Sequence, residues 1–313
     1  MSADMQLDIV VGFFIMGAVA RLLKSDLALP KGLYQSCVIF LLLAIGLKGG
    51  AALASYPLTT LLPQSLAVMV FGLLLPLPAF AILYGIGRWS RVDAAATAAH
   101  YGSVSVATYA VAVALLDASG VAYEGYFPLF VALLEVPAIV VGILLARQAS
   151  QASRGALAHE MLLNQGVVLL AGGIIIGAWA GERVASVMPF FGSLFHGVLA
   201  LFLLEMGRVA ASRLGDIREQ GAFLLTFGIV MPLIGGVSGG LLALWLELSA
   251  GGIFLMAVLG SSASYIAVPA AMAVALPGAN ASVSITASLA ITFPFNVLIA
   301  LPAYLAVVQH WRL

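Results

Sequence analysis

The chain has 313 residues, of which 63% are hydrophobic and only 8% charged, and its mean hydropathy is +1.14. Because so little polar surface cannot cover a water-soluble globule, the composition predicts an integral membrane protein and excludes a soluble enzyme. Lysine plus arginine equals aspartate plus glutamate at 13 each, so no basic excess favours nucleic acid as a partner.

Apolar runs between charged or turn-rich clusters predict an all-α polytopic membrane protein with ten transmembrane helices. Outer-membrane barrel strands would instead show short segments of alternating hydrophobicity. The first run follows two aspartates and precedes Arg21 and Lys24, which reverses the charge order of a signal peptide, so we expect it to be retained as a span. The expected spans are residues 8–23, 32–50, 59–87, 94–116, 125–146, 161–180, 190–210, 219–246, 250–276 and 282–308.

The basic residues predict the orientation of these spans. With the N-terminus outside, ten lysines and arginines fall in cytoplasmic loops and three fall outside, which is the asymmetry typical of a bacterial inner membrane protein. Both termini are therefore expected outside. The cytoplasmic residues would be Arg21, Lys24, Lys31, Arg88, Arg91, Arg147, Arg154, Arg208, Arg213 and Arg218, and the outer ones Lys48, Arg183 and Arg312.

Two motifs recur at nearly half the chain length. Residues 71–77 (Phe-Gly-Leu-Leu-Leu-Pro-Leu) return as residues 227–233 (Phe-Gly-Ile-Val-Met-Pro-Leu) at a shift of 156, and the serine cluster of residues 102–105 returns near 260–264 at a shift of 158. Chance recurrence is the alternative for one motif alone. Together they predict two homologous halves, residues 1–150 and 151–313. Because each half has five spans, the second half would enter the membrane from the opposite side, as in the inverted repeats of secondary transporters.

The fourth and ninth spans carry glycine and serine near their middles. Glycine can interrupt a helix there and serine can cap the restarted half, so N–H groups and hydroxyls would form an anion site between the two spans, and the freed carbonyls could bind sodium. The alternative is that these serines bond the carbonyl one turn back or allow helices to approach closely. The candidate substrate-binding residues are Gly102, Ser103, Val104, Ser105, Gly260, Ser261, Ser262, Ala263 and Ser264.

A few polar side chains interrupt the apolar spans. Glu135, near the centre of the fifth span, could bind a coupling cation, carry a proton or donate a hydrogen bond. Asn296 is its nearest counterpart in the second half, where an interhelical hydrogen bond is the favoured interpretation. Asp93, at the cytoplasmic end of the fourth span, could cap that helix or belong to a cation path. His100 beside Ser103 is the one pairing that suggests an intramembrane enzyme, and no nucleophile-elbow, phosphate-loop or metal-ligand motif supports an enzyme.

Several segments, taken in order, resemble the sodium-dependent bicarbonate transporter family best known from cyanobacteria, over almost the whole chain. The resemblance implies ten helices in two inverted five-helix repeats, core and gate domains, a homotrimer and sodium-coupled bicarbonate uptake by alternating access. In cyanobacteria it also implies inhibition by a PII-like regulatory protein. The segments that carry the resemblance are residues 29–31, 46–51, 102–105, 134–138, 261–269 and 279–282.

The resemblance also implies the residues that serve sodium, the coupling ion, and no other cofactor is expected. The sodium-binding set is Asp93, Thr108, Glu135 and Tyr265. Where this chain has Tyr265 and Glu135, the cyanobacterial members carry aspartate, so the first change removes a carboxylate while the second keeps the charge. The alternatives are a sodium-coupled carrier of another small anion, such as a carboxylate, and a sensor built on a degenerate transporter fold.

Overall fold

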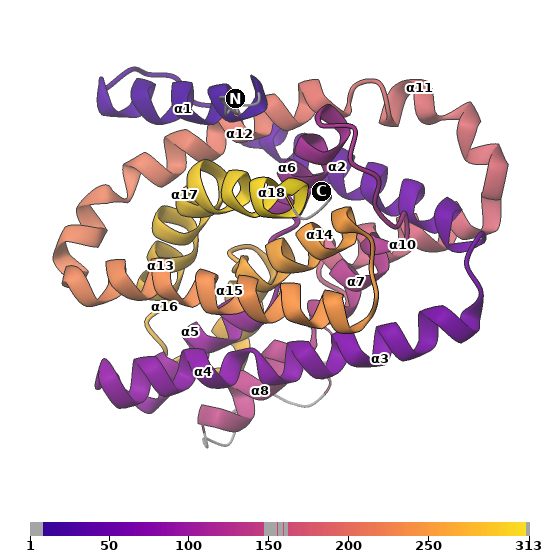
Figure 1. Cartoon of the computed structure of the whole chain (residues 1–313). Coiled ribbons are helices and arrows are strands. Elements are labelled where there is room, and N and C mark those ends of the chain that lie inside the picture. The colour runs from indigo at the N-terminus through magenta and orange to yellow at the C-terminus, as the bar shows by residue number, and fades with distance from the viewer. Residues whose placement is uncertain (1–8, 147–154, 156–158, 160–161, 311–313) are drawn as a thin grey trace.

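The computed structural model describes residues 9–146, 155, 159 and 162–310, and all the regular secondary structure in this part of the chain is helical (Figure 1). The first half contains α1 (Ile9–Leu22), α2 (Lys31–Leu53), α3 (Leu58–Leu74), α4 (Pro76–Ala81), η1 (Ile82–Ile86), α5 (Arg91–Gly102), α6 (Val106–Ala118), α7 (Phe127–Leu134) and α8 (Pro137–Ala146). The second contains α10 (Gln165–Ala180), η2 (Gly181–Ser186), α11 (Met188–Phe191), α12 (Phe195–Ser212), α13 (Leu214–Trp245), α14 (Ala250–Ser261), α15 (Ala267–Ala275), α16 (Ala281–Ile285), η3 (Thr286–Thr292), α17 (Phe293–Phe295), η4 (Asn296–Ala300) and α18 (Leu301–His310).

Within the described residues, eight helical segments are long and apolar enough to cross a membrane, and two apolar helices, α1 and α14, are shorter. The prediction of a multi-pass helical membrane protein is confirmed. The ten-span count remains a prediction, because α1 extends only about 21 Å at 1.5 Å per residue and is short for a membrane span. The inverted repeat and the division at residue 150 also remain predictions. Residue 150 and three residues used for the orientation lie outside the described part of the chain, namely Arg147, Arg154 and Arg312.

Four helices, α1, α2, α10 and α12, form one group, in which α1 packs along α12, α10 along α2, and α2 against α12. In Figure 1, α1, α12 and α2 lie in the upper part of the molecule and α10 lies at the right, with α3 and α4 in the lower part and α14 and α15 between. Each partnership therefore joins a helix of the first half to one of the second. We call α1, α2, α10 and α12 the four-helix group.

Glycines allow this close packing. A Cβ atom at Gly46 would lie 2.7 Å from the carbonyl oxygen of Leu170, and one at Gly177 would collide with the backbone of Leu47. In the other pair, Gly207 lies in the same way against the backbone of Phe14. The helix axes can approach this closely only because these positions lack a side chain.

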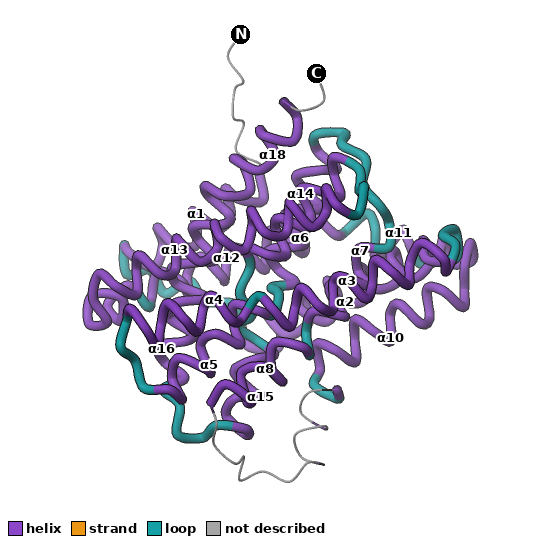
Figure 2. The backbone as a smooth tube through the Cα atoms, turned by 60° about the horizontal axis from the view of Figure 1, so that its bottom comes forward, coloured by secondary structure: helices purple, strands orange, loops and turns teal. Residues whose placement is uncertain are grey.

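The two ends of the molecule are distinguished by its loops. In Figure 2, α18 ends near the top, whereas α8 and α15 lie near the bottom. Along the chain, α2, then α3 to η1, then α5 to α6 cross the molecule in alternating directions. We therefore expect α2 and α6 to end on the side opposite to the start of α5. In the orientation expected from the basic residues, the bottom of Figure 2 is the cytoplasmic side.

We predict that Gly177→Val lowers the free energy of unfolding by about 1–3 kcal/mol, because the new side chain would overpack the contact between α10 and α2. Thermal unfolding of the detergent-purified protein measures the effect. Gly172→Val is the matched control on the same helix, since a Cβ at Gly172 meets nothing within 4 Å. Equal unfolding temperatures for the two variants would contradict the packing role.

Candidate functional site

Two helices are interrupted at the serine clusters. The first interruption, residues 103–105, lies between α5 and α6, and the second, residues 262–266, lies between α14 and α15. Both lie where the glycine and serine pattern predicts an interruption. Ser105 caps the restarted helix α6, since its hydroxyl oxygen accepts a hydrogen bond from the backbone N–H of Thr108 at 3.2 Å.

The two interruptions are hydrogen-bonded to each other. The backbone N–H of Ser264 donates to the carbonyl of His100 at 2.8 Å, and the N–H of Ser105 donates to the hydroxyl oxygen of Ser262 at 3.1 Å. The imidazole Nδ1 of His100 lies 2.7 Å from the carbonyl oxygen of Ser264 and donates to it. Residues more than 150 positions apart thus supply the backbone partners that each broken helix lacks. We call residues 100–105 and 261–266 together the crossing.

The serines of the second cluster also follow the alternative interpretation. The hydroxyl of Ser261 donates to the carbonyl of Val258 at 3.0 Å, and that of Ser262 donates to Leu259 at 2.9 Å. These bonds reach back within α14, as serine does in membrane helices. The hydroxyl oxygen of Ser262 still accepts from Ser105, so its role in the crossing does not depend on a free proton.

One polar side chain accompanies each cluster. The carboxylate of Glu135, between α7 and α8, is buried and accepts a hydrogen bond from the hydroxyl of Ser103 at 3.3 Å. The amide nitrogen of Asn296, in η4, donates to the carbonyl of Ser261 at 2.8 Å, as the favoured interpretation predicts. Its Oδ1 atom, however, is buried without a hydrogen-bond partner. This amide therefore brings an unused acceptor oxygen to the second interruption.

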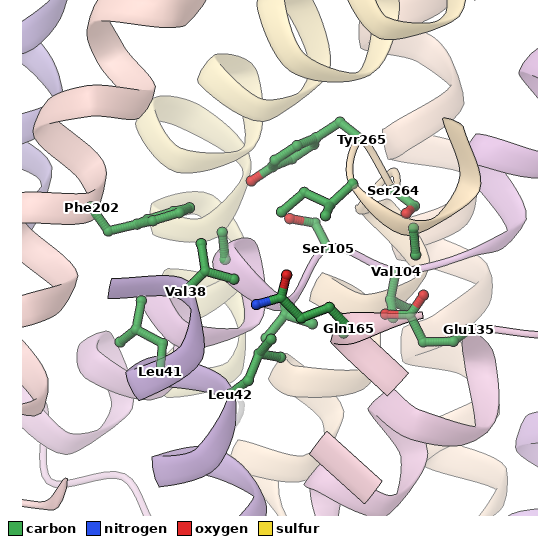
Figure 3. Close-up of a pocket in the computed structure, with 15 residues that line it drawn as sticks. Val38, Leu41, Leu42, Val104, Ser105, Glu135, Gln165, Phe202, Ser264 and Tyr265 are labelled. Atoms are coloured by element: carbon green, nitrogen blue, oxygen red, sulfur yellow. The ribbon is translucent and has the colours of Figure 1, made fainter. Parts of the chain in front are cut away.

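A cavity of about 80 Å³ lies beside the crossing (Figure 3). The crossing supplies Ser105, Ser264 and Tyr265 to its lining, and Glu135 lies on the same side. The remaining polar side chain, Gln165 from the first turn of α10, projects toward the middle of the cavity. The other lining residues are Val38, Leu41, Leu42, Val104, Val106, Ala107, Gly166, Phe202, Ile266 and Ala267.

The structure does not bring every predicted site residue to this cavity. Asp93 lies at the start of α5, about 15 Å along the helix from Ser103 at 1.5 Å per residue. There its carboxylate accepts from the Ser90 hydroxyl at 2.6 Å and from the backbone N–H of Asn280 at 2.7 Å. Ser90, not Asp93, is the N-cap of α5, because its hydroxyl oxygen accepts from the Asp93 N–H, and Asp93 supports this cap from the first turn. Thr108 is buried in the first turn of α6, directly after the first interruption.

Other predicted residues contribute backbone or packing. Gly102 ends α5, and a Cβ there would lie 2.6 Å from the Cδ of Pro76, so glycine is required where α4 crosses α5. Gly260 packs against the backbone of Gly235 in α13 in the same way. Val104 lines the cavity, whereas Ala263 is packed in a separate apolar cluster.

The structure does not pair His100 with Ser103, as an intramembrane enzyme would require. His100 bonds the Ser264 carbonyl, and the Ser103 hydroxyl bonds Glu135, so neither of the two residues serves the other as nucleophile and base. Among the described residues, no group of three or more histidine, cysteine, aspartate or glutamate side chains could hold a metal ion. A cation at the crossing would therefore rely on hydroxyl, amide and carbonyl oxygens together with the single carboxyl group of Glu135.

Gln165 and the apolar lining residues of α2 and α12 were missed by sequence reasoning. Gln165 follows the last turn-rich residues before an apolar run, where a polar residue is ordinary. Val38 and Phe202 carry no signal that separates a cavity wall from any buried helix face. Only the packing of α2, α10 and α12 against the crossing assigns them to the site.

Comparison with protein families identifies the chain. The model of the Na⁺-dependent bicarbonate transporter superfamily matches residues 9–309, which is nearly the whole chain, so the protein belongs to this superfamily. The resemblance seen in the sequence is confirmed. A search of curated proteins found no match.

Proposed function

Since the chain belongs to the Na⁺-dependent bicarbonate transporter superfamily, we propose that it takes up bicarbonate, or a similar small anion, together with sodium by alternating access. The observation that carries the proposal is the crossing, where two helices from different halves are interrupted at the same depth and bonded to each other. Interrupted helices that meet inside a membrane are the usual construction of transporter ion sites.

The anion would bind at the N-terminal ends of α6 and α15, beside Ser105 and Ser264. Each helix end contributes about half a positive charge, and the described residues bring no arginine or lysine to the cavity lining. Glu135, the acidic side chain in the same lining, offers an anion no attraction. An anion therefore needs a compensating cation there, which is the physical reason to expect coupling to sodium.

Sodium would bind oxygen atoms near the two interruptions. One is the unpartnered Oδ1 of Asn296 in η4, and another is the hydroxyl of Thr108 in α6, which packs against η4. The carboxyl group of Glu135, bonded to Ser103 in the first interruption, is a third. Hard cations prefer such oxygen ligands. Asp93 is left out of this set because of its distance along α5. Tyr265 is left out because its protonated phenol is a hydrogen-bond donor, which suits the anion.

Alternating access requires that one end of the site close while the other opens. On the outer side, Lys48 of α2 lies 3.7 Å from a carboxylate oxygen of Asp117 and donates to the Tyr123 hydroxyl at 3.3 Å. Tyr123 in turn donates to Asp117 at 3.4 Å, and burial raises the pKa of this phenol, so it keeps the proton that it donates. We call Lys48, Asp117 and Tyr123 the outer latch. It joins the four-helix group to the end of α6 and the loop before α7.

On the other side, a cavity of about 230 Å³ extends from Tyr265 and Ile266 to Tyr34 and Glu205, near the ends of α2 and α12 that we expect in the cytoplasm. The described structure thus fits a state in which the outer latch is closed and the crossing faces inward. The four-helix group would serve as the gate domain and the helices around the crossing as the core domain.

The family resemblance also implies features that the geometry of one chain does not address. We propose a homotrimer in the bacterial inner membrane with both termini outside, and inhibition by a PII-like regulatory protein where such a partner exists. Native mass spectrometry of the purified protein would overturn the trimer by showing a monomer alone. Labelling of terminal cysteines from inside only would overturn the orientation.

Sodium coupling predicts that uptake needs both ions together. Proteoliposomes with an inward sodium gradient should accumulate radiolabelled bicarbonate at least about tenfold faster than vesicles with potassium in place of sodium, because charge compensation in the cavity is lost without the coupling ion. Vesicles without protein are the control for diffusion of carbon dioxide. Equal rates with sodium and potassium would refute the coupling.

The crossing predicts that Ser103→Ala combined with Ser262→Ala abolishes uptake. The double variant leaves the Glu135 carboxylate and the Ser105 N–H without their hydroxyl partners, so the site loses its arrangement while the helices remain. Uptake and thermal unfolding are both measured, and a folded but inactive protein is the expected result. Ser36→Ala, which removes an exposed hydroxyl from α2, is the control. Transport near the original rate in the double variant would dismiss this site.

The outer latch predicts that Lys48→Met shifts the protein toward its outward-facing state. Exposed ion pairs contribute about 0.2–1 kcal/mol, so the outward population should rise by up to about fivefold. A further cavity is lined by Val113 together with the three latch residues. A cysteine placed at Val113 reports the shift through labelling from outside, after the native Cys37 is replaced by serine. Labelling as slow as with Lys48 in place would contradict the latch.

A further inference from the structure

The cavity beside the crossing has two unlike walls. The crossing side carries the hydroxyls of Ser105, Ser264 and Tyr265, whereas the four-helix group faces them with hydrocarbon (Figure 3). The apolar wall consists of Val38, Leu41, Leu42 and Phe202, from α2 and α12. A ligand that spans the cavity therefore meets hydroxyls on one side and hydrocarbon on the other, with the amide of Gln165 projecting between them.

Tyr265 points its hydroxyl into this space. The oxygen atom is buried and makes no hydrogen bond of good geometry, with the Ser105 hydroxyl beside it, and the ring has an edge contact with Phe293 at 5.5 Å between centroids. A buried polar group without a partner is costly, by about 1–3 kcal/mol, so a partner is expected when the site is filled. A protonated phenol is a neutral donor, which suits an anionic oxygen better than it suits sodium.

Bicarbonate satisfies only one of these walls. Its carboxylate edge can accept hydrogen bonds from Tyr265 and Ser105, but its third oxygen would lie toward the hydrocarbon wall, where among the described lining residues only the Gln165 amide could replace part of its hydration. An anion with the same carboxylate edge and a short hydrocarbon chain in place of the third oxygen would satisfy both walls.

We propose that this cavity binds short-chain monocarboxylates as well as bicarbonate, with the carboxylate on the hydroxyls of Tyr265 and Ser105 and the hydrocarbon chain against Val38, Leu42 and Phe202. The proposal rests on the function proposed above, whose site it uses, and it names a further substrate class for that site. Tyr265 then offers the anion a hydrogen-bond donor at the position where the cyanobacterial members carry an aspartate, which could bind a cation.

The test is equilibrium binding by the detergent-purified protein in sodium, measured by isothermal titration with formate, acetate, propionate and butyrate. Each buried methylene should tighten binding by about fourfold, so butyrate should bind about sixteenfold more tightly than acetate. Bicarbonate should compete with each of them. Uptake of radiolabelled propionate into proteoliposomes then shows whether the bound anion is also carried.

Two conservative variants separate the walls. Tyr265→Phe keeps the ring but removes the donor, so it should weaken acetate and butyrate alike, by about tenfold. Val38→Thr keeps the shape but adds a hydroxyl to the apolar wall, so it should reduce the gain per methylene and with it the preference for butyrate over acetate. Tyr126→Phe is the control, because that phenol donates to Gln64 far from the cavity.

The outcomes distinguish this proposal from the proposed function. If bicarbonate uptake requires sodium but no carboxylate binds or competes, the carboxylate proposal is wrong and the transport proposal stands. If carboxylates bind with the expected gain per methylene while bicarbonate uptake ignores sodium, the proposed coupling is wrong and the assignment of the two walls stands. Equal affinity for formate and butyrate, or full affinity in Tyr265→Phe, overturns the assignment.

Discussion

The structure depends on the hydrogen bonds that two broken helices make to each other. Inside a bilayer no water is present to satisfy a freed N–H or carbonyl, so a helix can end there only if protein groups replace its lost partners. Here Ser264 bonds the carbonyl of His100, and Ser105 bonds Ser262, so each interruption repairs the other. Neither half of the chain could leave its helix broken at this depth without the other half.

The crossing in turn determines what the surrounding helices must do. The four-helix group covers one side of it, and its helices pack by glycine contacts such as Gly46 against α10 and Gly207 against α1. Such contacts hold the helix axes close together, because backbone meets backbone with little side chain between. A closely packed group beside a polar crossing fits a mechanism in which one body moves against the other, and the outer latch joins these two bodies at one end.

Charge governs the chemistry of the cavity. Its lining carries one carboxylate, Glu135, and no lysine or arginine, so a bound anion relies on helix ends, hydroxyls and an accompanying cation. The buried oxygen of Asn296 and the buried hydroxyl of Tyr265 are both without partners, yet they differ in kind. An amide oxygen can only accept, which suits a cation, whereas a protonated phenol donates, which suits an anion. The two unpartnered atoms thus match a cation and an anion bound together.

The sequence by itself determined the membrane class, the extents of most helices and the positions of both interruptions. These features depend on local properties, namely the length of an apolar run and the glycine and serine within it. Family membership was also readable, because it rests on the order of segments such as residues 102–105 and 261–269.

Only the tertiary structure decided which side chains share the cavity. It kept Asp93 at the start of α5, brought Gln165 and Phe202 to the site, and left Tyr265 without a partner. The direction of a side chain depends on which helices pack around it, and those neighbours lie tens to hundreds of residues away. A pattern along one segment records the burial of a residue, but not the group that it will meet.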